Sequence, residues 1–135
     1  MAEKSVIGVP TPRVEGEQKV SGQAVYALDV TLPNTLWVKT LRSPLPHARI
    51  KKIDCSKALQ LSGVRAVLTG KDIPGARIGK KIIDMPVLAQ DVVRFVGEKV
   101  AAVAAESEEI ATQAVDLIEA EYEEMAGVLD PLDGM

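Results

Sequence analysis

Cysteine, histidine and aromatic residues are scarce in this chain of 135 residues. Cys55 is the only cysteine, which excludes an internal disulfide, an iron–sulfur cluster and a cysteine-based zinc site, because each of these needs several sulfurs. His47 is the only histidine, so no second imidazole can join it around a metal ion. Because only 3% of the residues are aromatic, we expect an aliphatic core.

Long apolar runs are also missing. The longest, residues 100–105, has six residues, whereas a membrane-spanning helix needs about 20. No apolar segment of the signal-peptide type follows the first four residues. We therefore expect a soluble, cytoplasmic protein that makes no membrane contact.

Charge is unevenly distributed along the chain, although the net charge is only −3. Residues 39–81 carry eleven bases against Asp54 and Asp72, a net +9, whereas residues 100–135 carry ten acids and no base. Two interpretations follow. The two stretches form neighbouring surfaces that neutralise each other, or the basic stretch holds an acidic partner or an anionic ligand. Nucleic acid is disfavoured, because no aromatic residues alternate with the bases.

The sequence contains no recognisable catalytic or cofactor-binding motif. Cys55 and His47 could form a nucleophile and base, but a half-buried, inert thiol is the favoured interpretation. The segment around Gly79-Lys80-Lys81 fails as a phosphate-binding loop, because Pro74 and Lys81 occupy the first glycine and the hydroxyl positions. We therefore assign no catalytic, cofactor-binding or metal-binding residue.

The pattern of apolar and turn residues predicts an α+β domain of about five to seven short strands and two helices. Residues 1–22 are predicted to be an extended arm and residues 23–135 a single domain, with a mobile or partner-ordered loop at 70–90. The predicted strands are 24–29, 35–42, 48–53, 64–69, 94–96 and 100–105. Asp54 or Ser56 is expected to cap a helix that ends near residue 59. Ser107 is expected to cap a second helix that ends near residue 120, and a strand or tail is predicted over 122–130.

Five short motifs occur in an order that resembles the molybdenum-binding subunits of the xanthine dehydrogenase and aldehyde oxidase family. They are RVEGEQKVSGQAVYALD at 13–29, LRSP with HARI at 41–50, IDCS with LSGV at 53–64, RFVGEKVA at 94–101 and IEAEYE at 118–123. Each motif is weak alone, but together they cover about residues 8–132. Lys99, where the family usually has proline, and residues 125–127 depart from the family pattern.

The resemblance implies an a/b hammerhead domain, the N-terminal domain of the large subunit. Enzymes of the family hydroxylate aldehydes or aromatic N-heterocycles, with a molybdopterin cofactor on downstream domains and iron–sulfur and FAD centres on partner domains. No residue of this chain matches the family's catalytic positions, so the resemblance implies a structural and interface domain that is inactive alone. The alternatives are a free-standing binding module that uses residues 39–81 and a small enzyme built on Cys55.

The motifs also suggest roles for individual residues. His47 is expected to bond to backbone at the turn after Pro46. Four motif glycines are expected at turns that need unusual backbone angles: Gly16, Gly22, Gly63 and Gly97.

Overall fold

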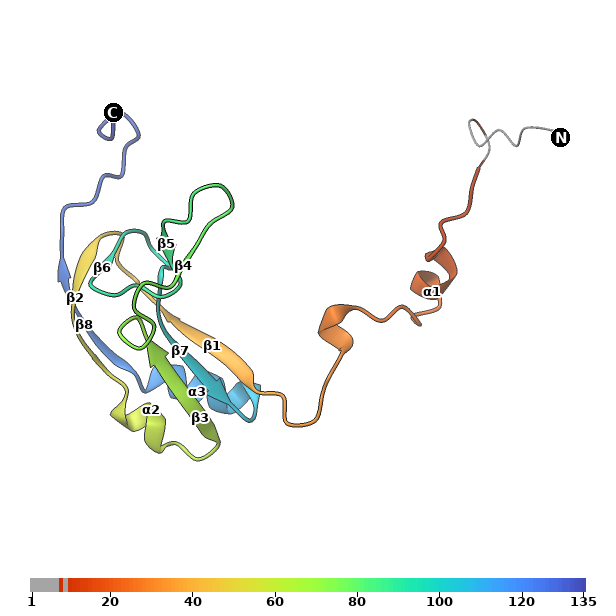
Figure 1. Cartoon of the computed structure of the whole chain (residues 1–135), viewed down its shortest axis with the longest axis horizontal. Helices are drawn as coiled ribbons and strands as arrows, with labels where there is room; N and C mark the ends of the chain where they lie inside the picture. The colour runs from red at the N-terminus through yellow and green to blue at the C-terminus, as the bar shows by residue number, and fades with distance from the viewer. Residues whose placement is uncertain (1–7, 9) are drawn as a thin grey trace. The chain divides into compact units, whose positions relative to one another are not determined.

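The structure is a computed structural model that describes residue 8 and residues 10–135 (Figure 1). The chain divides into two units, residues 1–33 and 34–135. The described residues form eight β-strands, three α-helices and one 3-10 helix, and the second unit holds all eight strands. The predicted α+β class is confirmed. Residues 1–7 and 9 of the predicted arm lie outside the described residues.

The first unit has no buried residue in its described part. It contains helix α1 (Gly16–Val20), where an extended arm was expected, and a 3-10 helix (Ala27–Asp29) in place of the strand predicted over 24–29. That strand does not form because the Asp29 carboxylate accepts a hydrogen bond from the Tyr26 amide at 2.8 Å and closes a turn. Gly16 lies within α1 and has no positive φ, so the prediction of an unusual backbone angle at this residue is wrong.

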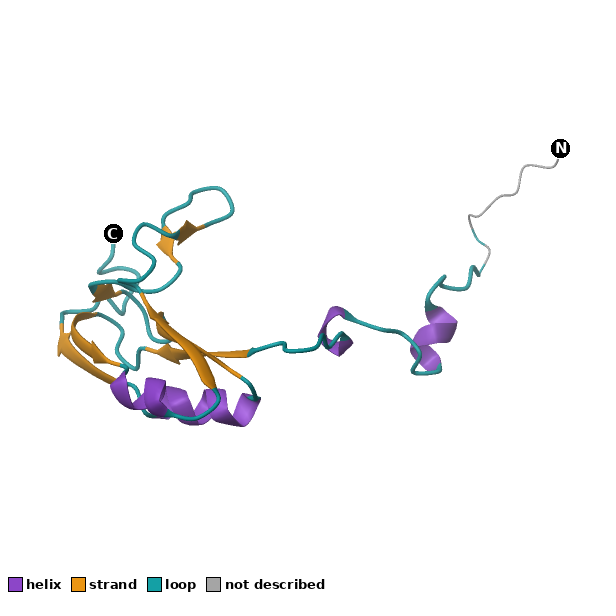
Figure 2. Cartoon of the chain, turned by 60° about the horizontal axis from the view of Figure 1, so that its bottom comes forward, coloured by secondary structure: helices purple, strands orange, loops and turns teal. Residues whose placement is uncertain are grey.

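The first sheet of the second unit has the antiparallel order β1-β7-β3. Its strands are β1 (Trp37–Arg42), β7 (Lys99–Ala105) and β3 (Val64–Thr69). The expected central position of the apolar strand at 100–105 is confirmed. Helices α2 (Ser56–Gln60) and α3 (Glu108–Asp116) lie together on one side of the strands (Figure 2). No helix in the described part of the chain is long and apolar enough to cross a bilayer.

A second sheet has the order β6-β2-β8 and a third is a two-stranded hairpin. The second comprises β6 (Val92–Val93), β2 (Ala48–Asp54) and β8 (Glu119–Glu124), and the hairpin pairs β4 (Arg77–Ile78) with β5 (Met85–Pro86). The hairpin lies inside the predicted loop. The prediction of a strand over 94–96 is wrong, because the chain turns there. Strand β6 covers Val92–Val93 instead.

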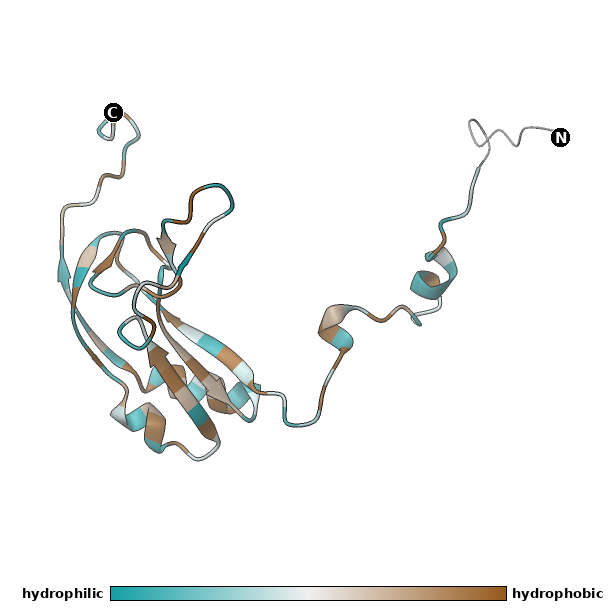
Figure 3. Ribbon diagram, viewed as in Figure 1, coloured by the Kyte–Doolittle hydropathy of each residue, from teal (hydrophilic) through white to brown (hydrophobic). Residues whose placement is uncertain are grey.

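The core consists of small aliphatic side chains in two clusters, as expected from the scarcity of aromatics. One cluster lies between the first sheet and the helices and includes Ala101, Val103 and Ala114. The other lies around β2 and β7 and includes Ala48 and Val100. The apolar residues of β3 and β7 appear as brown segments in Figure 3.

The predicted cap at Ser107 is confirmed, because its Oγ accepts a hydrogen bond from the Ile110 amide at 3.2 Å. The predicted cap of α2 by Asp54 or Ser56 is wrong, because Cys55 is the N-cap residue and its side chain makes no capping hydrogen bond. Asp54, one residue earlier, accepts a hydrogen bond from the Ser56 amide at 3.0 Å through its Oδ1. Helix α3 ends at Asp116, four residues earlier than predicted, because Ile118 enters the core and Glu119 pairs with Asp54 on β2. The last strand therefore begins at residue 119 and not at 122.

Candidate functional site

Two of the sequence motifs meet at a tight connection between the turn after β1 and the turn before β7. The Ser43 amide donates to the Glu98 carbonyl at 2.9 Å, and the Gly97 amide donates to the Ser43 carbonyl at 2.8 Å. Ser43 is 2% exposed and Glu98 is 4% exposed. We call this feature, formed by Arg42, Ser43, Arg94, Gly97 and Glu98, the Ser43–Glu98 junction.

The buried Glu98 carboxylate is stabilised by donors from its own turn. The Arg94 amide donates to Glu98 Oε2 at 2.5 Å, and the Arg94 Nη1 atom lies 3.4 Å from Oε1. Arg42 Nη1 donates to the Gly97 carbonyl at 2.9 Å and ties the turn to β1. A buried carboxylate needs such partners, because it has lost its hydration. We did not identify Glu98 from the sequence, although the Arg94–Glu98 spacing of four residues was the available signal.

An apolar groove of about 490 Å³ lies beside the Ser43–Glu98 junction. Pro46, Phe95 and Val96 line it together with Val128 and Leu129 from the C-terminal segment. Phe95 is 48% exposed and Leu129 is 81% exposed. Contiguous exposed apolar side chains of this kind mark interaction surfaces. We call this feature the Phe95 groove.

His47 fixes one wall of the Phe95 groove through its contacts with the C-terminal segment. Its Nδ1 atom lies 2.6 Å from the Ala126 carbonyl, and its own carbonyl accepts a hydrogen bond from the Met125 amide at 2.9 Å. The expected backbone bonding of His47 is confirmed. The same contacts hold the C-terminal segment at residues 125–126, where the sequence departs from the family pattern.

Cys55 lies at the opposite end of β2 from His47. The seven residues of β2 separate the two by about 23 Å, so they cannot act as nucleophile and base. Burial, followed by the nearby Asp54 charge, raises the pKa of the Cys55 thiol above its ordinary value, and the thiol is therefore protonated at neutral pH. The interpretation of Cys55 as an inert, partly buried thiol is favoured.

Five of the eleven bases in the stretch 39–81 form ion pairs with acids from the C-terminal third. Lys39 contacts Glu108 at 2.6 Å and Lys51 contacts Glu123 at 2.7 Å. The remaining ion pairs between these two stretches are Arg49–Glu123, Lys57–Glu119 and Arg65–Glu106. The structure thus favours mutual neutralisation of neighbouring surfaces, and a free-standing module built on the net charge of this stretch is not supported.

The glycine–lysine segment that resembles a phosphate loop is the tip of a hairpin. Gly79, Lys80 and Lys81 connect β4 with β5, whereas a phosphate loop leads into a helix whose amides bind the phosphates. The interpretation as a nucleotide site is excluded on this geometry.

The sequence and fold match those of proteins with known assignments. The family model described as "Aldehyde oxidase and xanthine dehydrogenase, a/b hammerhead domain" matches residues 21–126. A probable xanthine dehydrogenase subunit of Bacillus subtilis (strain 168) is 49% identical over 114 residues, which cover 84% of this chain and 15% of that protein. The nicotinate dehydrogenase large molybdopterin subunit of Eubacterium barkeri is 42% identical over 91% of this chain and 29% of its own length.

Solved structures agree with these relatives. A Cu,Mo-CO dehydrogenase superposes with a TM-score of 0.90 at 38% identity, covering 95% of this chain and 17% of that chain. Quinoline 2-oxidoreductase from Pseudomonas putida 86 gives a TM-score of 0.86 at 38% identity, covering 98% of this chain and 18% of that chain. These folds define a domain of a molybdenum-containing oxidoreductase.

The chain belongs to the aldehyde oxidase and xanthine dehydrogenase family, as its a/b hammerhead domain. It spans between 15% and 29% of the length of the two relatives named above.

The Phe95 groove does not fit the redox groups of a molybdenum hydroxylase. Within the described residues, no three His, Cys, Asp or Glu side chains gather as metal ligands. Arg94 is the one permanently charged side chain that lines the Phe95 groove. A groove with a single such cation is a poor match for a phosphate-bearing pterin. No redox step is therefore derived from this chain.

Proposed function

We propose that this chain is a structural and interface domain of a molybdenum hydroxylase large subunit and is inactive by itself. Its partners are the catalytic molybdenum-binding domain or subunit and, through it, iron–sulfur and flavin subunits. The molybdopterin cofactor binds to those other domains, and the iron–sulfur and FAD centres belong to partner domains. Residues 1–22 serve as an arm that contacts the same partner.

The observation that carries this proposal is the Phe95 groove on a domain that is only a small part of each relative. The Ser43–Glu98 junction rigidly positions one wall of the groove, and the His47–Ala126 contact positions the other. An apolar surface held in place by hydrogen bonds on both walls suits a permanent contact between domains, because little conformational entropy is lost on docking.

The test is affinity purification of the tagged chain from its native cell extract, followed by mass spectrometry and elemental analysis. We expect an equimolar molybdenum-containing subunit, with dye-linked oxidation of a purine or aldehyde only when that subunit is present. Stoichiometric molybdenum on the chain alone would contradict the proposal.

A pair of variants locates the contact. Phe95→Ser places a hydroxyl in the groove and is expected to reduce recovery of the molybdenum subunit at least tenfold. Leu59→Ser makes a comparable change at a half-exposed position on α2 and is expected to leave recovery unchanged. Equal loss in both variants would show that the groove is not the contact.

A further inference from the structure

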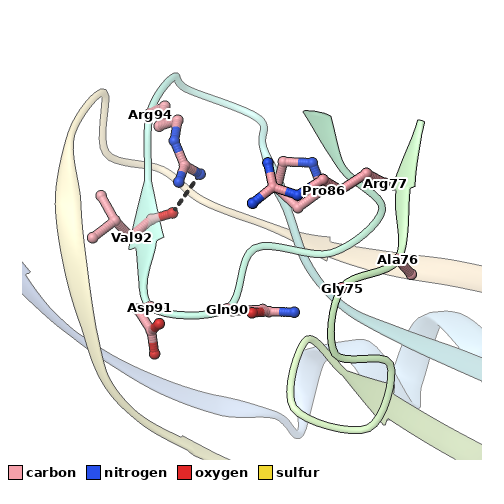
Figure 4. Close-up of a pocket in the computed structure, with 8 residues that line it drawn as sticks. All are labelled: Gly75, Ala76, Arg77, Pro86, Gln90, Asp91, Val92 and Arg94. Atoms are coloured by element: carbon pink, nitrogen blue, oxygen red, sulfur yellow. Dashed lines mark hydrogen bonds between the residues drawn. The ribbon is translucent and has the colours of Figure 1, made fainter. Parts of the chain in front are cut away.

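A second, polar pocket lies between the β4–β5 hairpin and strand β6, outside the Phe95 groove (Figure 4). Its volume is about 250 Å³, and its lining includes Arg77 and Pro86 from the hairpin with Gln90, Asp91 and Arg94 from the segment around β6. Arg94 contributes to both features. The volume is below the roughly 300–1,000 Å³ of sites for drug-sized molecules, so the pocket suits a small group.

Two guanidinium groups reach into this pocket from different elements. Figure 4 shows the Arg77 side chain extending toward Arg94, whereas the Asp91 carboxylate points away from both. Arg77 Nη1 donates to the Asp84 carbonyl at 2.7 Å, and Arg94 Nη1 donates to the Val92 carbonyl at 3.2 Å. Each of these bonds uses one Nη1 atom, so other N–H donors remain on both planar groups.

Both walls of the pocket are held by backbone hydrogen bonds. The Val87 amide donates to the Ala76 carbonyl at 3.1 Å within the hairpin, and the Ile50 amide donates to the Asp91 carbonyl at 2.8 Å beside β6. These hydrogen bonds fix the backbone from which the Arg77 and Arg94 side chains extend into the pocket.

The two arginines of the pocket differ in how their charges are paired. Arg94 contacts the Glu98 carboxylate at 3.4 Å, but Arg77 makes no ion pair with any described residue. The planar donor sets of the two guanidinium groups match the oxygens of a carboxylate or phosphate.

We propose that Arg77 and Arg94 form a binding site for a small oxyanion, a carboxylate or a phosphate group. The Gln90 carboxamide lies on the same lining and supplies a further donor. The site depends on two particular side chains and not on the net charge of residues 39–81. It does not rest on the proposed function, since it concerns this chain alone.

The experiment is a titration of the full chain followed by NMR of the arginine Nε–Hε signals. Inorganic phosphate and acetate are added separately, and sodium chloride at matched ionic strength controls for screening. We expect saturable shifts of the Arg77 and Arg94 signals with at least one of the two anions and none with chloride. If neither anion gives saturable shifts, the proposal is overturned.

The two anions distinguish the source of the oxyanion. Binding of phosphate without acetate identifies a phosphate-type ligand, whereas binding of acetate without phosphate identifies a carboxylate ligand. Either result supports the site.

Arg77→Gln is the decisive variant, because Arg77 supports no buried acid and its loss leaves the Ser43–Glu98 junction intact. We expect at least tenfold weaker binding in this variant. Arg65→Gln removes the same charge from β3, away from the pocket, and is expected to bind as the unmodified chain does. Thermal unfolding of each variant verifies that it is folded. Equal binding by Arg77→Gln and Arg65→Gln would overturn the proposal.

Discussion

The Ser43–Glu98 junction and the ion-paired surface of β2, α2 and β8, formed by Arg49, Lys51, Lys57, Glu119 and Glu123, use the same chemical groups in opposite ways. At the junction one carboxylate is buried and accepts hydrogen bonds from a fixed amide and a guanidinium. On the paired surface the carboxylates of Glu119 and Glu123 are each about half exposed or more and contact flexible cations. Burial, and not the number of ion pairs, therefore decides where a charge holds this fold together.

The largest effect is expected for Glu98→Gln. The substitution keeps an acceptor for the Arg94 amide but removes the charge, and hydrogen bonds to charged groups contribute about 1.5–3 kcal/mol. We expect the free energy of unfolding, measured by urea denaturation, to fall by about 2 kcal/mol.

The matched control is Glu106→Gln, which removes the same charge from the exposed pair with Arg65. That variant is expected to unfold at nearly the same urea concentration as the unmodified chain. Equal destabilisation by the two variants would show that burial at the junction has no special energetic role.

A smaller loss is expected for Gly97→Ala, which tests the backbone of the junction instead of its charge. Gly97 has φ of +88°, and a Cβ atom there would meet no other atom within 4 Å, so only the left-handed backbone opposes the substitution. That conformation costs an L-residue about 1–2 kcal/mol. Gly16→Ala is the control, because Gly16 lies in α1 with no positive φ, and alanine favours a helix there. Urea denaturation of Gly97→Ala without loss of stability would contradict the prediction.

The Tyr122 hydroxyl extends the comparison of buried with exposed polar groups, because it is buried without a hydrogen-bond partner among the described residues. Its hydroxyl is buried and makes no hydrogen bond with any residue that the structure describes, and burial raises the pKa of Tyr122. Tyr122→Phe removes the unpartnered hydroxyl and is expected to leave stability unchanged or raise it by up to about 1 kcal/mol. A clear loss of stability in urea denaturation would mean that the hydroxyl has a partner in solution, such as a bound water.

The sequence predicted the strands whose pattern depends on local burial and missed features that depend on distant partners. Strands β1, β2, β3 and β7 were predicted because alternation and the apolar run at 100–105 reflect the sheet directly. The end of α3 was placed too late, because Ile118 and Tyr122 continue a helical spacing while pairing of residues 119–124 with β2 imposes a strand.

The site was less predictable than the fold for the same reason. Arg42 and Gly97 lie 55 residues apart, so nothing local to either motif indicates that Glu98 is buried between them. The resemblance identified the family from the same residues, but it did not show how they meet. Likewise, the excess of bases over 39–81 had two interpretations until the structure placed the acids beside them.

Asp54 offers a test at a partly exposed position where hydrogen bonds, and not burial, stabilise a charge. The hydrogen bonds from Ser56, followed by the interaction with Lys52, lower the pKa of Asp54 from 3.8 to about 2. Because the folded-state pKa is depressed, the stabilisation is complete above about pH 4 and disappears as the pH falls to about 2. The stability difference between the unmodified chain and Asp54→Asn, measured by urea denaturation across this range, is expected to shrink with acid. A difference independent of pH would show that the Asp54 charge does not stabilise the start of α2.

The smallest effect is expected for Lys51→Gln on the paired surface. Lys51 contacts Glu123 at 2.7 Å, yet Arg49 lies 3.6 Å from the same carboxylate and remains in the variant. Both side chains of the Lys51–Glu123 pair are about half exposed, so water and salt screen their attraction. We expect the urea midpoint of the variant to match that of the unmodified chain at physiological salt and to differ only at low ionic strength. A loss comparable to that of Glu98→Gln would mean that the charges of this surface act as a network, and the contrast with the junction would no longer hold.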